Sequence, residues 1–261
     1  MIVAVEGPSA AGKTTWCKAT GAPFVAEYAP TGREPDGSDP VAQATYWAQV
    51  NSRRWTQALG LEQSTALAVC DSDPLKLHYS WCLAAVGAAP LVRFEYELTA
   101  VREMFAQRRL GFADVVLLSI PDPQQLVRQR DGDRTRRRGH FELHARLAEP
   151  LTQWYAALER LDPGRVLDGF PPELDIAPLP EPRGDRHDMG LLDSLIDELE
   201  WSRAVSGSQG WRRCPQPSDS AISSASDVMS TRRLVSTINS RPPSSSGPRK
   251  VARMAATRSS T

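Results

Sequence analysis

The chain carries one contiguous set of residues whose types and spacing could bind phosphate. Residues 7–15 read GPSAAGKTT and match the pattern G-x-x-x-x-G-K-[ST]. Glycine permits a close backbone approach, so consecutive N–H groups can point at phosphate oxygens, and a following helix adds its positive end. The lysine can reach the β- and γ-phosphates, and the next hydroxyl can ligate Mg²⁺. The pattern predicts ATP and Mg²⁺ as cofactors, held by Gly7, Pro8, Ser9, Ala10, Ala11, Gly12, Lys13, Thr14 and Thr15.

The lysine at this position is informative because the chain seldom uses lysine. Only four of its 31 basic residues are lysines, yet the pattern position holds one. None of the four follows an asparagine, so the N-K-x-D motif that reads guanine in GTPases is missing from the sequence. The run 66–70 ends in Asp71-Ser72-Asp73 with no adjacent glutamate, unlike the Walker B pair of large ATPases. GTPases and large ATPases are therefore disfavoured.

Carboxylates follow two of the predicted strands. Phosphoryl transfer needs an acceptor hydroxyl held in line, and a carboxylate often orients the attacking oxygen. Glu27 is the candidate, because strand ends beside a phosphate loop form the ligand crevice of open α/β sheets; a solvated strand-end carboxylate is the alternative. Asp71 is predicted at the metal, with Thr14, or at its water shell. Asp73 is predicted at a substrate hydroxyl, with turn formation ahead of Pro74 as the alternative.

Two further groups of side chains are candidates for the site. Arginines gather at 128–138, between helical stretches at 123–128 and 141–161, as a mobile lid requires. We predict that Arg130 and Arg134 contact phosphate and act in catalysis.

Substrate recognition is predicted on the helix that opens at Pro40. There Gln43, Tyr46 and Trp47 offer amide and aromatic groups that can pair with and stack on a base. Helical spacing equally allows Tyr46 and Trp47 to be ordinary core, so both interpretations stay open. His78 and His140 are predicted to be bystanders.

The elements that must position these residues follow a regular alternation. Between residue 1 and about 178, short apolar β-branched runs alternate with helical patterns, which predicts an α/β fold: a three-layer P-loop NTPase fold with a parallel sheet of about five strands flanked by helices. Ser38 or Asp39 can cap a helix with Pro40 at its first position, and Asp122 with Pro123 repeats the device. The predicted strands are 2–6, 24–27, 67–71, 115–120 and 165–168.

Composition divides the chain into unlike parts. We predict a domain at 1–178, a Pro-rich linker and amphipathic helix at 179–205, and a disordered Ser/Arg-rich basic tail at 206–261. The helix is expected at 191–204, with Leu192, Leu195, Ile196 and Leu199 on one face. The zero net charge is a cancellation, because the tail holds nine Lys/Arg against two Asp/Glu and residues 1–205 hold 22 against 29.

The same composition predicts the surroundings of the protein. The total charge gives no reason to expect nucleic acid as a partner. No apolar run approaches the roughly 18 to 20 residues of a membrane span, and residues 1–6 lack the basic stretch of a secretory signal. We therefore expect a cytoplasmic protein without a membrane partner. Its four cysteines form no C-x-x-C pair and are predicted to be free thiols, and the sequence gives no oligomeric state.

With these residues in view, the chain resembles the P-loop nucleoside and nucleotide kinases. Residues 24–28 (FVAEY) resemble the second strand of nucleoside and ribosylnicotinamide kinases, which ends in a carboxylate beside the acceptor hydroxyl. Residues 69–73 (VCDSD) resemble the D-T-D segment of ribosylnicotinamide kinases, and the arginine cluster resembles the lid of the superfamily. Residues 32–37 (GREPDG) are similar to the R-E-P-G-G loop of thymidylate kinases, but that family has Asp-Arg where this chain has Asp71-Ser72.

The resemblance spans about residues 1–170 and implies a P-loop kinase-like domain. It implies an ATP- and Mg²⁺-dependent phosphotransferase that moves the γ-phosphate to a hydroxyl or phosphate of a small molecule, a nucleoside or nucleotide first. The missing arginine favours a nucleoside or another small alcohol over a thymidylate. Two alternatives stay open: a non-enzymatic ATP-binding sensor or regulator, and a kinase of an antibiotic or other specialised metabolite.

Overall fold

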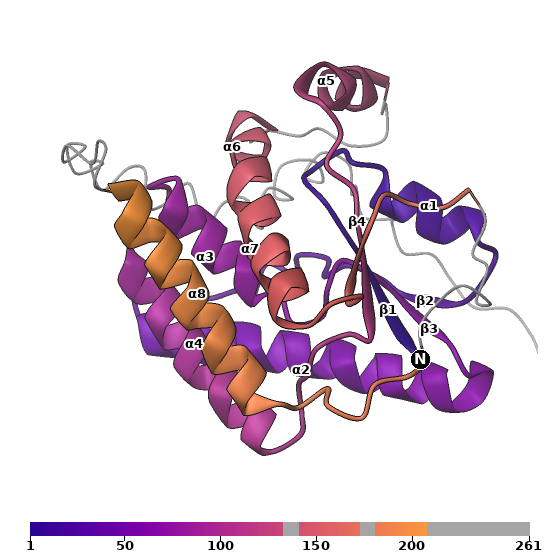
Figure 1. Ribbon diagram of the computed structural model, residues 1–261, viewed down its shortest axis with the longest axis horizontal. Helices are drawn as coiled ribbons and strands as arrows, with labels where there is room; N and C mark the ends of the chain where they lie inside the picture. The colour runs from indigo at the N-terminus through magenta and orange to yellow at the C-terminus, as the bar shows by residue number, and fades with distance from the viewer. Residues whose placement is uncertain (133–140, 173–180, 208–261) are drawn as a thin grey trace, which may run out of the picture. The chain divides into compact units, whose positions relative to one another are not determined.

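A computed structural model describes residues 1–132, 141–172 and 181–207 of the chain. Its centre is a sheet of five parallel strands in the order β2-β3-β1-β4-β5 (Figure 1). Each predicted strand is confirmed: the first has the predicted bounds, and each of the other four is one or two residues shorter at one end. Their bounds are β1 (Ile2–Glu6), β2 (Phe24–Val25), β3 (Ala68–Asp71), β4 (Val115–Leu118) and β5 (Val166–Asp168).

Both faces of the sheet are covered, which explains why its strands carry apolar residues on both faces rather than at alternate positions, while β1, β3 and β5 each end in a carboxylate. In β1, Ile2 and Ala4 belong to one buried cluster, whereas Val3 and Val5 belong to another. The second cluster lies under α1 (Lys13–Ala19), which contributes Cys17. The predicted three-layer α/β fold is therefore confirmed.

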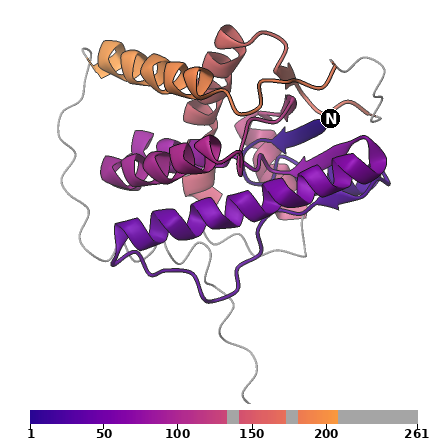
Figure 2. The same ribbon diagram turned by 90° about the horizontal axis from the view of Figure 1, so that it is seen from below.

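The first cluster lies under a larger set of helices. Trp55, Trp81 and Trp154 are fully buried there and come from three different helices. Figure 2 shows three long helices of this layer, α2, α4 and α8, one beyond another. The layer is built from α2 (Pro40–Thr65), α3 (Leu77–Ala85), α4 (Leu91–Ala106), α7 (Ala148–Leu161) and α8 (Met189–Gly207). Two shorter helices, α5 (Pro123–Gly132) and α6 (Phe141–Arg146), lie between β4 and α7 in the chain.

The predicted helix starts are confirmed in detail. The Asp39 carboxylate accepts hydrogen bonds from the backbone N–H groups of Val41 and Ala42, both at 3.0 Å, and Pro40 is the first residue of α2. Asp122 accepts from the backbone of Gln125 at 2.8 Å ahead of α5. Both caps satisfy N–H groups that have no partner inside their helix.

The predicted amphipathic helix is α8, and its Leu192, Leu195, Ile196 and Leu199 are buried in the first cluster. Arg160 of α7 donates to Glu198 of α8 at 2.9 Å, which fixes one helix on the other. Most of the predicted basic tail, the last residues of the predicted domain (173–178) and the first two of the predicted linker (179–180) lie outside the described residues. The division at 178 and 205 therefore stays a prediction.

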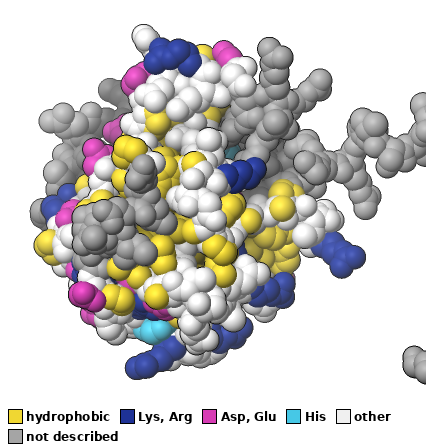
Figure 3. Space-filling view, turned by 90° about the vertical axis from the view of Figure 1, so that its right-hand side faces the viewer, with side chains coloured by type: hydrophobic (Ala, Val, Ile, Leu, Met, Phe, Trp, Pro, Cys, Tyr) yellow, Lys and Arg dark blue, Asp and Glu magenta, His cyan; other side chains and the backbone are white. Residues whose placement is uncertain are grey.

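The surface bears on the predicted partners. On the face drawn in Figure 3, lysine and arginine side chains lie at separated places among hydrophobic and uncharged ones. No helix within the described ranges is both long enough and apolar enough to cross a membrane.

Cys17, Cys70 and Cys82 are buried free thiols, as predicted, and Cys214 lies outside the described residues.

Candidate active site

A cavity of about 1000 Å³ opens at the carboxyl ends of the strands. In the sheet, β1 lies between β3 and β4. The chain places β2 and β3 on one side of β1 and then β4 and β5 on the other, so the strand order reverses at β1. Ligands of open parallel sheets bind in the crevice at such a point. All nine residues of the predicted phosphate loop, Gly7 to Thr15, line this cavity.

The loop has the shape that its glycines predict. A Cβ atom at Gly7 would stand 2.3 Å from the backbone oxygen of Ser119, so a larger residue there would collide with the backbone after β4. Gly12, the N-cap of α1, has φ 90°, in the left-handed region that favours glycine. The loop therefore turns sharply from β1 into α1, whose positive end faces the cavity.

Lys13 lies across this loop. Its Nζ donates to the backbone oxygens of Gly7 at 2.6 Å and Pro8 at 3.4 Å, and it lies 3.7 Å from Glu6 Oε1. Two of these partners are backbone carbonyls, which hold the ammonium weakly compared with a phosphate. The arrangement keeps a cation in the loop, ready for an anion.

Thr14 and Asp71 form the predicted metal pair. The Thr14 hydroxyl donates to Asp71 Oδ2 at 2.6 Å, and Asp71 Oδ1 is buried without a hydrogen-bond partner. Burial, followed by the nearby charges of Glu27 and Glu6, raises the pKa of Asp71. A cation at this place would give the buried Asp71 Oδ1 a partner and, by favouring the charged carboxylate, would lower the pKa of Asp71 again.

A hydroxyl and a carboxylate oxygen are of the kind that Mg²⁺ binds, together with phosphate and water. Thr14 lines the cavity, whereas Asp71 lies behind it and is not one of the lining residues. No group of three or more His, Cys, Asp or Glu side chains in the described part of the chain could hold a metal by itself.

Glu6, the last residue of β1, is the most connected carboxylate of the cavity. Its Oε2 accepts from Ser72 Oγ at 2.8 Å and from the backbone of Asp73 at 3.1 Å, and lies 3.3 Å from His78 Nε2 and 3.5 Å from Lys76 Nζ. Only 2% of the side chain is exposed, so burial would raise its pKa. The charges of Lys76, His78 and Lys13 outweigh burial and hold the pKa of Glu6 well below its usual range.

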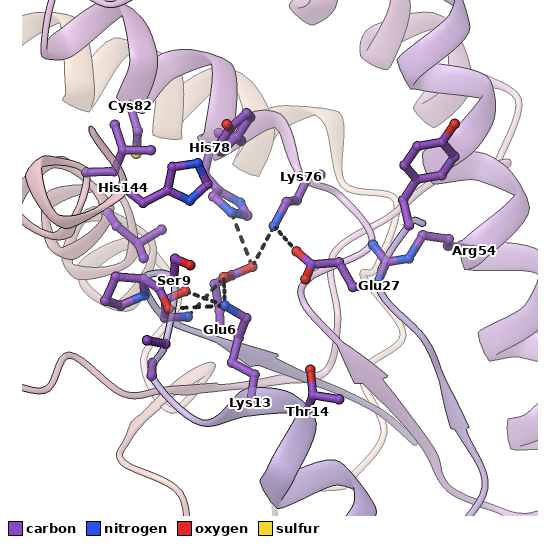
Figure 4. Close-up of a pocket in the computed structure, with 18 of the residues that line it drawn as sticks. Glu6, Ser9, Lys13, Thr14, Glu27, Arg54, Lys76, His78, Cys82 and His144 are labelled. Atoms are coloured by element: carbon purple, nitrogen blue, oxygen red, sulfur yellow. Dashed lines mark hydrogen bonds and ion pairs between the residues drawn. The ribbon is translucent and has the colours of Figure 1, made fainter. Parts of the chain in front are cut away.

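Glu27 faces the same cavity from just beyond β2. Its Oε1 lies 3.5 Å from Lys76 Nζ, and Figure 4 shows Lys76 between the Glu6 and Glu27 carboxylates. Burial opposes ionisation, but Lys76 and then Lys13 prevail and lower the pKa of Glu27. The predicted carboxylate is therefore ionised and points into the cavity.

Asp73 does not line the cavity. One oxygen accepts from the backbone of Leu75 at 2.9 Å and the other from the Tyr155 hydroxyl at 2.9 Å. These contacts match the turn-forming alternative and differ from the predicted contact with a substrate hydroxyl.

Of the three recognition residues predicted on α2, two line the cavity and one does not. Gln43 and Trp47 line the cavity, with Tyr28 and Glu34 of the preceding loop. Tyr46 does not line it; the Tyr46 and Tyr28 hydroxyls lie 2.7 Å apart. The indole Nε1 of Trp47 and the Oε2 of Glu34 are buried without hydrogen-bond partners.

Only one of the two predicted arginines can be placed. Arg130 of α5 donates to Asp131 at 2.8 Å and its guanidinium lies 4.4 Å from the centre of the Phe141 ring. It does not line the cavity, although its neighbours Gln129 and Gly132 do. Arg134, the rest of the cluster up to Arg138, and His140 lie outside the described residues.

Sequence reasoning missed four residues of the site: Glu6, Arg54, Lys76 and His78. The Arg54 side chain is buried and donates to the backbone oxygens of Asp71 and Ser72, both at 2.7 Å, so it braces the end of β3. His78, predicted to be a bystander, contacts Glu6. The rarity of lysine, which supported Lys13, applied equally to Lys76.

The sheet order, the loop between β1 and α1 and the Thr14–Asp71 pair define a P-loop α/β protein. No family model and no curated protein matches the chain. Among solved structures, the chain is similar to deoxyadenosine kinase from M. mycoides. The structure of that enzyme with the products dCMP and a flexible dCDP has 13% sequence identity and a TM-score of 0.45, covering 79% of this chain and 100% of the enzyme. The structure with bound dATP has 11% identity and a TM-score of 0.43, covering 78% and 100%.

Proposed function

We propose that this protein is an ATP- and Mg²⁺-dependent phosphotransferase whose acceptor is a hydroxyl group of a nucleoside. The observation that carries the proposal is that one cavity holds both the phosphate loop and the ionised Glu27 carboxylate. A donor phosphate on the loop and an acceptor beside Glu27 would then share one enclosed space, as transfer requires.

Each step has a candidate group on the chain. Lys13 would exchange its carbonyl contacts for the β- and γ-phosphate oxygens. Thr14 and Asp71 would hold Mg²⁺, which neutralises charge on the phosphates when bound. The acceptor oxygen would attack the γ-phosphorus as its bond to the bridging oxygen breaks, and the hydroxyl proton would pass to Glu27, leaving ADP and a phosphorylated acceptor.

The charges beyond Glu27 favour an uncharged hydroxyl over an acceptor phosphate. Arg54 donates its hydrogen bonds to backbone oxygens, Arg93 donates to Glu97 at 3.0 Å, and Lys76 lies between two carboxylates. Within the described residues, Arg54, Arg93 and Lys76 therefore already have partners inside the protein at this end of the cavity. A second phosphate would have to displace them.

The unpartnered polar atoms at this end favour a nucleoside. Buried polar groups are normally hydrogen-bonded, so the Trp47 N–H and Glu34 Oε2 call for a ligand with both an acceptor and a donor. A nucleobase offers both, together with a flat face that could stack on one of the Trp47 and Tyr28 rings, which stand at 86° to each other.

The test is phosphate transfer from γ-labelled ATP to a panel of nucleosides, nucleoside monophosphates and non-nucleoside alcohols. We expect a labelled nucleoside monophosphate, and none with Lys13→Ala. ATP binding without transfer to any member would contradict the proposal and favour the sensor, whereas transfer to non-nucleoside alcohols alone would favour the specialised-metabolite kinase.

A further inference from the structure

We propose that Lys76 is a positioning residue that fixes the Glu27 carboxylate for the acceptor and, through Glu6, ties it to the phosphate loop. This inference rests on the proposed function. Lys76 precedes α3 and belongs to neither the phosphate loop nor the segments that resemble known kinases.

The contacts of Lys76 are with side chains of the protein. Its Nζ lies 3.5 Å from Glu6 Oε2, 3.5 Å from Glu27 Oε1, and donates to Ser72 Oγ. The Ser72 hydroxyl in turn donates to Glu6 Oε2 at 2.8 Å, so these two partners lie on one side of the ammonium group, and Glu27 is its third partner. A ligand phosphate would have to compete with two carboxylates for Lys76.

Glu27 depends on this contact more than Glu6 does. The Glu27 side chain is 38% exposed and follows a strand of only two residues, whereas Glu6 is 2% exposed and accepts several further hydrogen bonds. Among the described residues, Lys76 is the one cation within ion-pair distance of Glu27. Without Lys76, Glu27 would lose its restraint and Glu6 would keep most of its own.

The backbone supports the same role. Lys76 has φ 50°, a left-handed conformation that is unfavourable for a residue with a side chain. Such a conformation persists where surrounding contacts require it, and here it precedes the first turn of α3. The conformation brings a long cation from a buried turn to both carboxylates (Figure 4).

Glu6 extends the connection to the donor side. While Oε2 faces Lys76, Oε1 accepts from the backbone of Gly7 at 2.9 Å and lies 3.7 Å from Lys13. Glu27, Lys76, Glu6 and Lys13 thus form an alternating row of charges across the cavity. The row sets the distance between the group that orients the acceptor and the group that holds the donor.

A double-mutant cycle tests the inference. Lys76→Gln keeps a donor for Ser72 but removes the charge, and we expect kcat to fall by about 30-fold, because a misplaced catalytic group costs up to about 100-fold. The KM for ATP should stay within about twofold. In a Glu27→Gln background the same change should cost less than about threefold, since interacting residues are not additive. Lys76→Arg, which keeps the charge, should recover most of kcat.

The outcomes separate the two proposals. If the unmodified protein phosphorylates no acceptor, the proposed function fails. If it is active and Lys76→Gln costs the same with and without Glu27, or costs no more than Arg53→Gln on the exposed side of α2, Lys76 does not act through Glu27. Should Lys76→Gln lose ATP binding, Lys76→Arg decides: a kcat as low as that of Glu27→Gln overturns the inference, and a kcat near that of the unmodified protein supports it.

Discussion

The proposed donor end of the cavity, at the phosphate loop, and the proposed acceptor end, around Glu27, are built in different ways. The donor end is nine consecutive residues between one strand and one helix. The acceptor end takes Glu27 from the loop after β2, Trp47 from α2, Lys76 from the turn before α3 and Glu97 from α4. A site made by local backbone can be recognised in a sequence, whereas one assembled from several elements cannot.

The two ends also treat charge differently. Lys13 rests mainly on backbone carbonyls, which an incoming phosphate can replace. Lys76 and Arg93 rest on carboxylates, which hold a cation far more firmly. The two ends therefore suit the proposed transfer from a triphosphate to an uncharged hydroxyl, because an anion can replace the partners of the loop cation, whereas the cations beyond Glu27 are already paired with carboxylates.

Removing Lys13 should have the largest effect and should act on the donor end alone. We expect Lys13→Ala to lower kcat/KM by about 10³-fold, because the cation faces the transferred group in the transition state. Titration calorimetry should show weaker ATP binding, with Arg53→Ala as the matched control. Equal ATP affinity in both variants would remove the loop from the site.

Removing the Glu27 charge should act on the acceptor end alone. We expect Glu27→Gln to lower kcat by about 100-fold while ATP affinity is unchanged, since a carboxylate that accepts the hydroxyl proton contributes about 10²- to 10⁴-fold. Steady-state kinetics with the best acceptor measures the loss, and Glu95→Gln on the exposed side of α4 is the control. A kcat like that of the unmodified protein would exclude Glu27 as the base.

Glu62 is remote from both ends of the cavity, and changing it should alter the stability of the protein without altering ATP affinity or kcat. Hydrogen bonds from Arg186 hold the pKa of Glu62 at about 2 against its partial burial, where an ordinary glutamate has 4.5. Because the folded-state pKa is lowered, the stabilisation is present above 4.5 and is lost as the pH falls from 4.5 towards 2. We expect it to be about 2 kcal/mol.

Urea unfolding at pH 5.5 and pH 3 measures this term. Glu62→Gln should lose stability at pH 5.5 and lose less than the unmodified protein on acidification, with ATP affinity and kcat unchanged. The same pH dependence in both proteins would show that Glu62 does not carry it.

The smallest effect is expected from Trp47, compared with its neighbour Tyr46, at the proposed acceptor end. Trp47→Phe keeps a ring but removes the unpartnered N–H, and we expect the KM of a nucleoside acceptor to rise about tenfold with little change in kcat. Tyr46→Phe removes a hydroxyl that faces Tyr28 rather than the cavity, and its effect should be smaller. Equal effects of the two changes would place the acceptor elsewhere.

Periodicity and punctuation predicted the architecture because they act locally. The apolar run 2–6 had to be a strand buried on both faces, and Asp39 with Pro40 had to begin a helix. The ends of β2 and β4 were less predictable, since Ala26 and Glu27 at one and Ser119 and Ile120 at the other lie beyond the sheet. Glu27 leaves it to line the cavity.

The sequence by itself determined the phosphate loop, because the roles of Gly7, Gly12 and Lys13 follow from backbone geometry within nine residues. It also identified Glu27 and Asp71 as carboxylates at strand ends. Only the tertiary structure decided which of these groups meet. It turned Asp73 towards Tyr155, brought Lys76 between Glu6 and Glu27, and placed Trp47 in the cavity beside Tyr28 and Glu34. Those contacts join residues on different elements, and their distances depend on how helices pack on the sheet, which a single sequence does not fix.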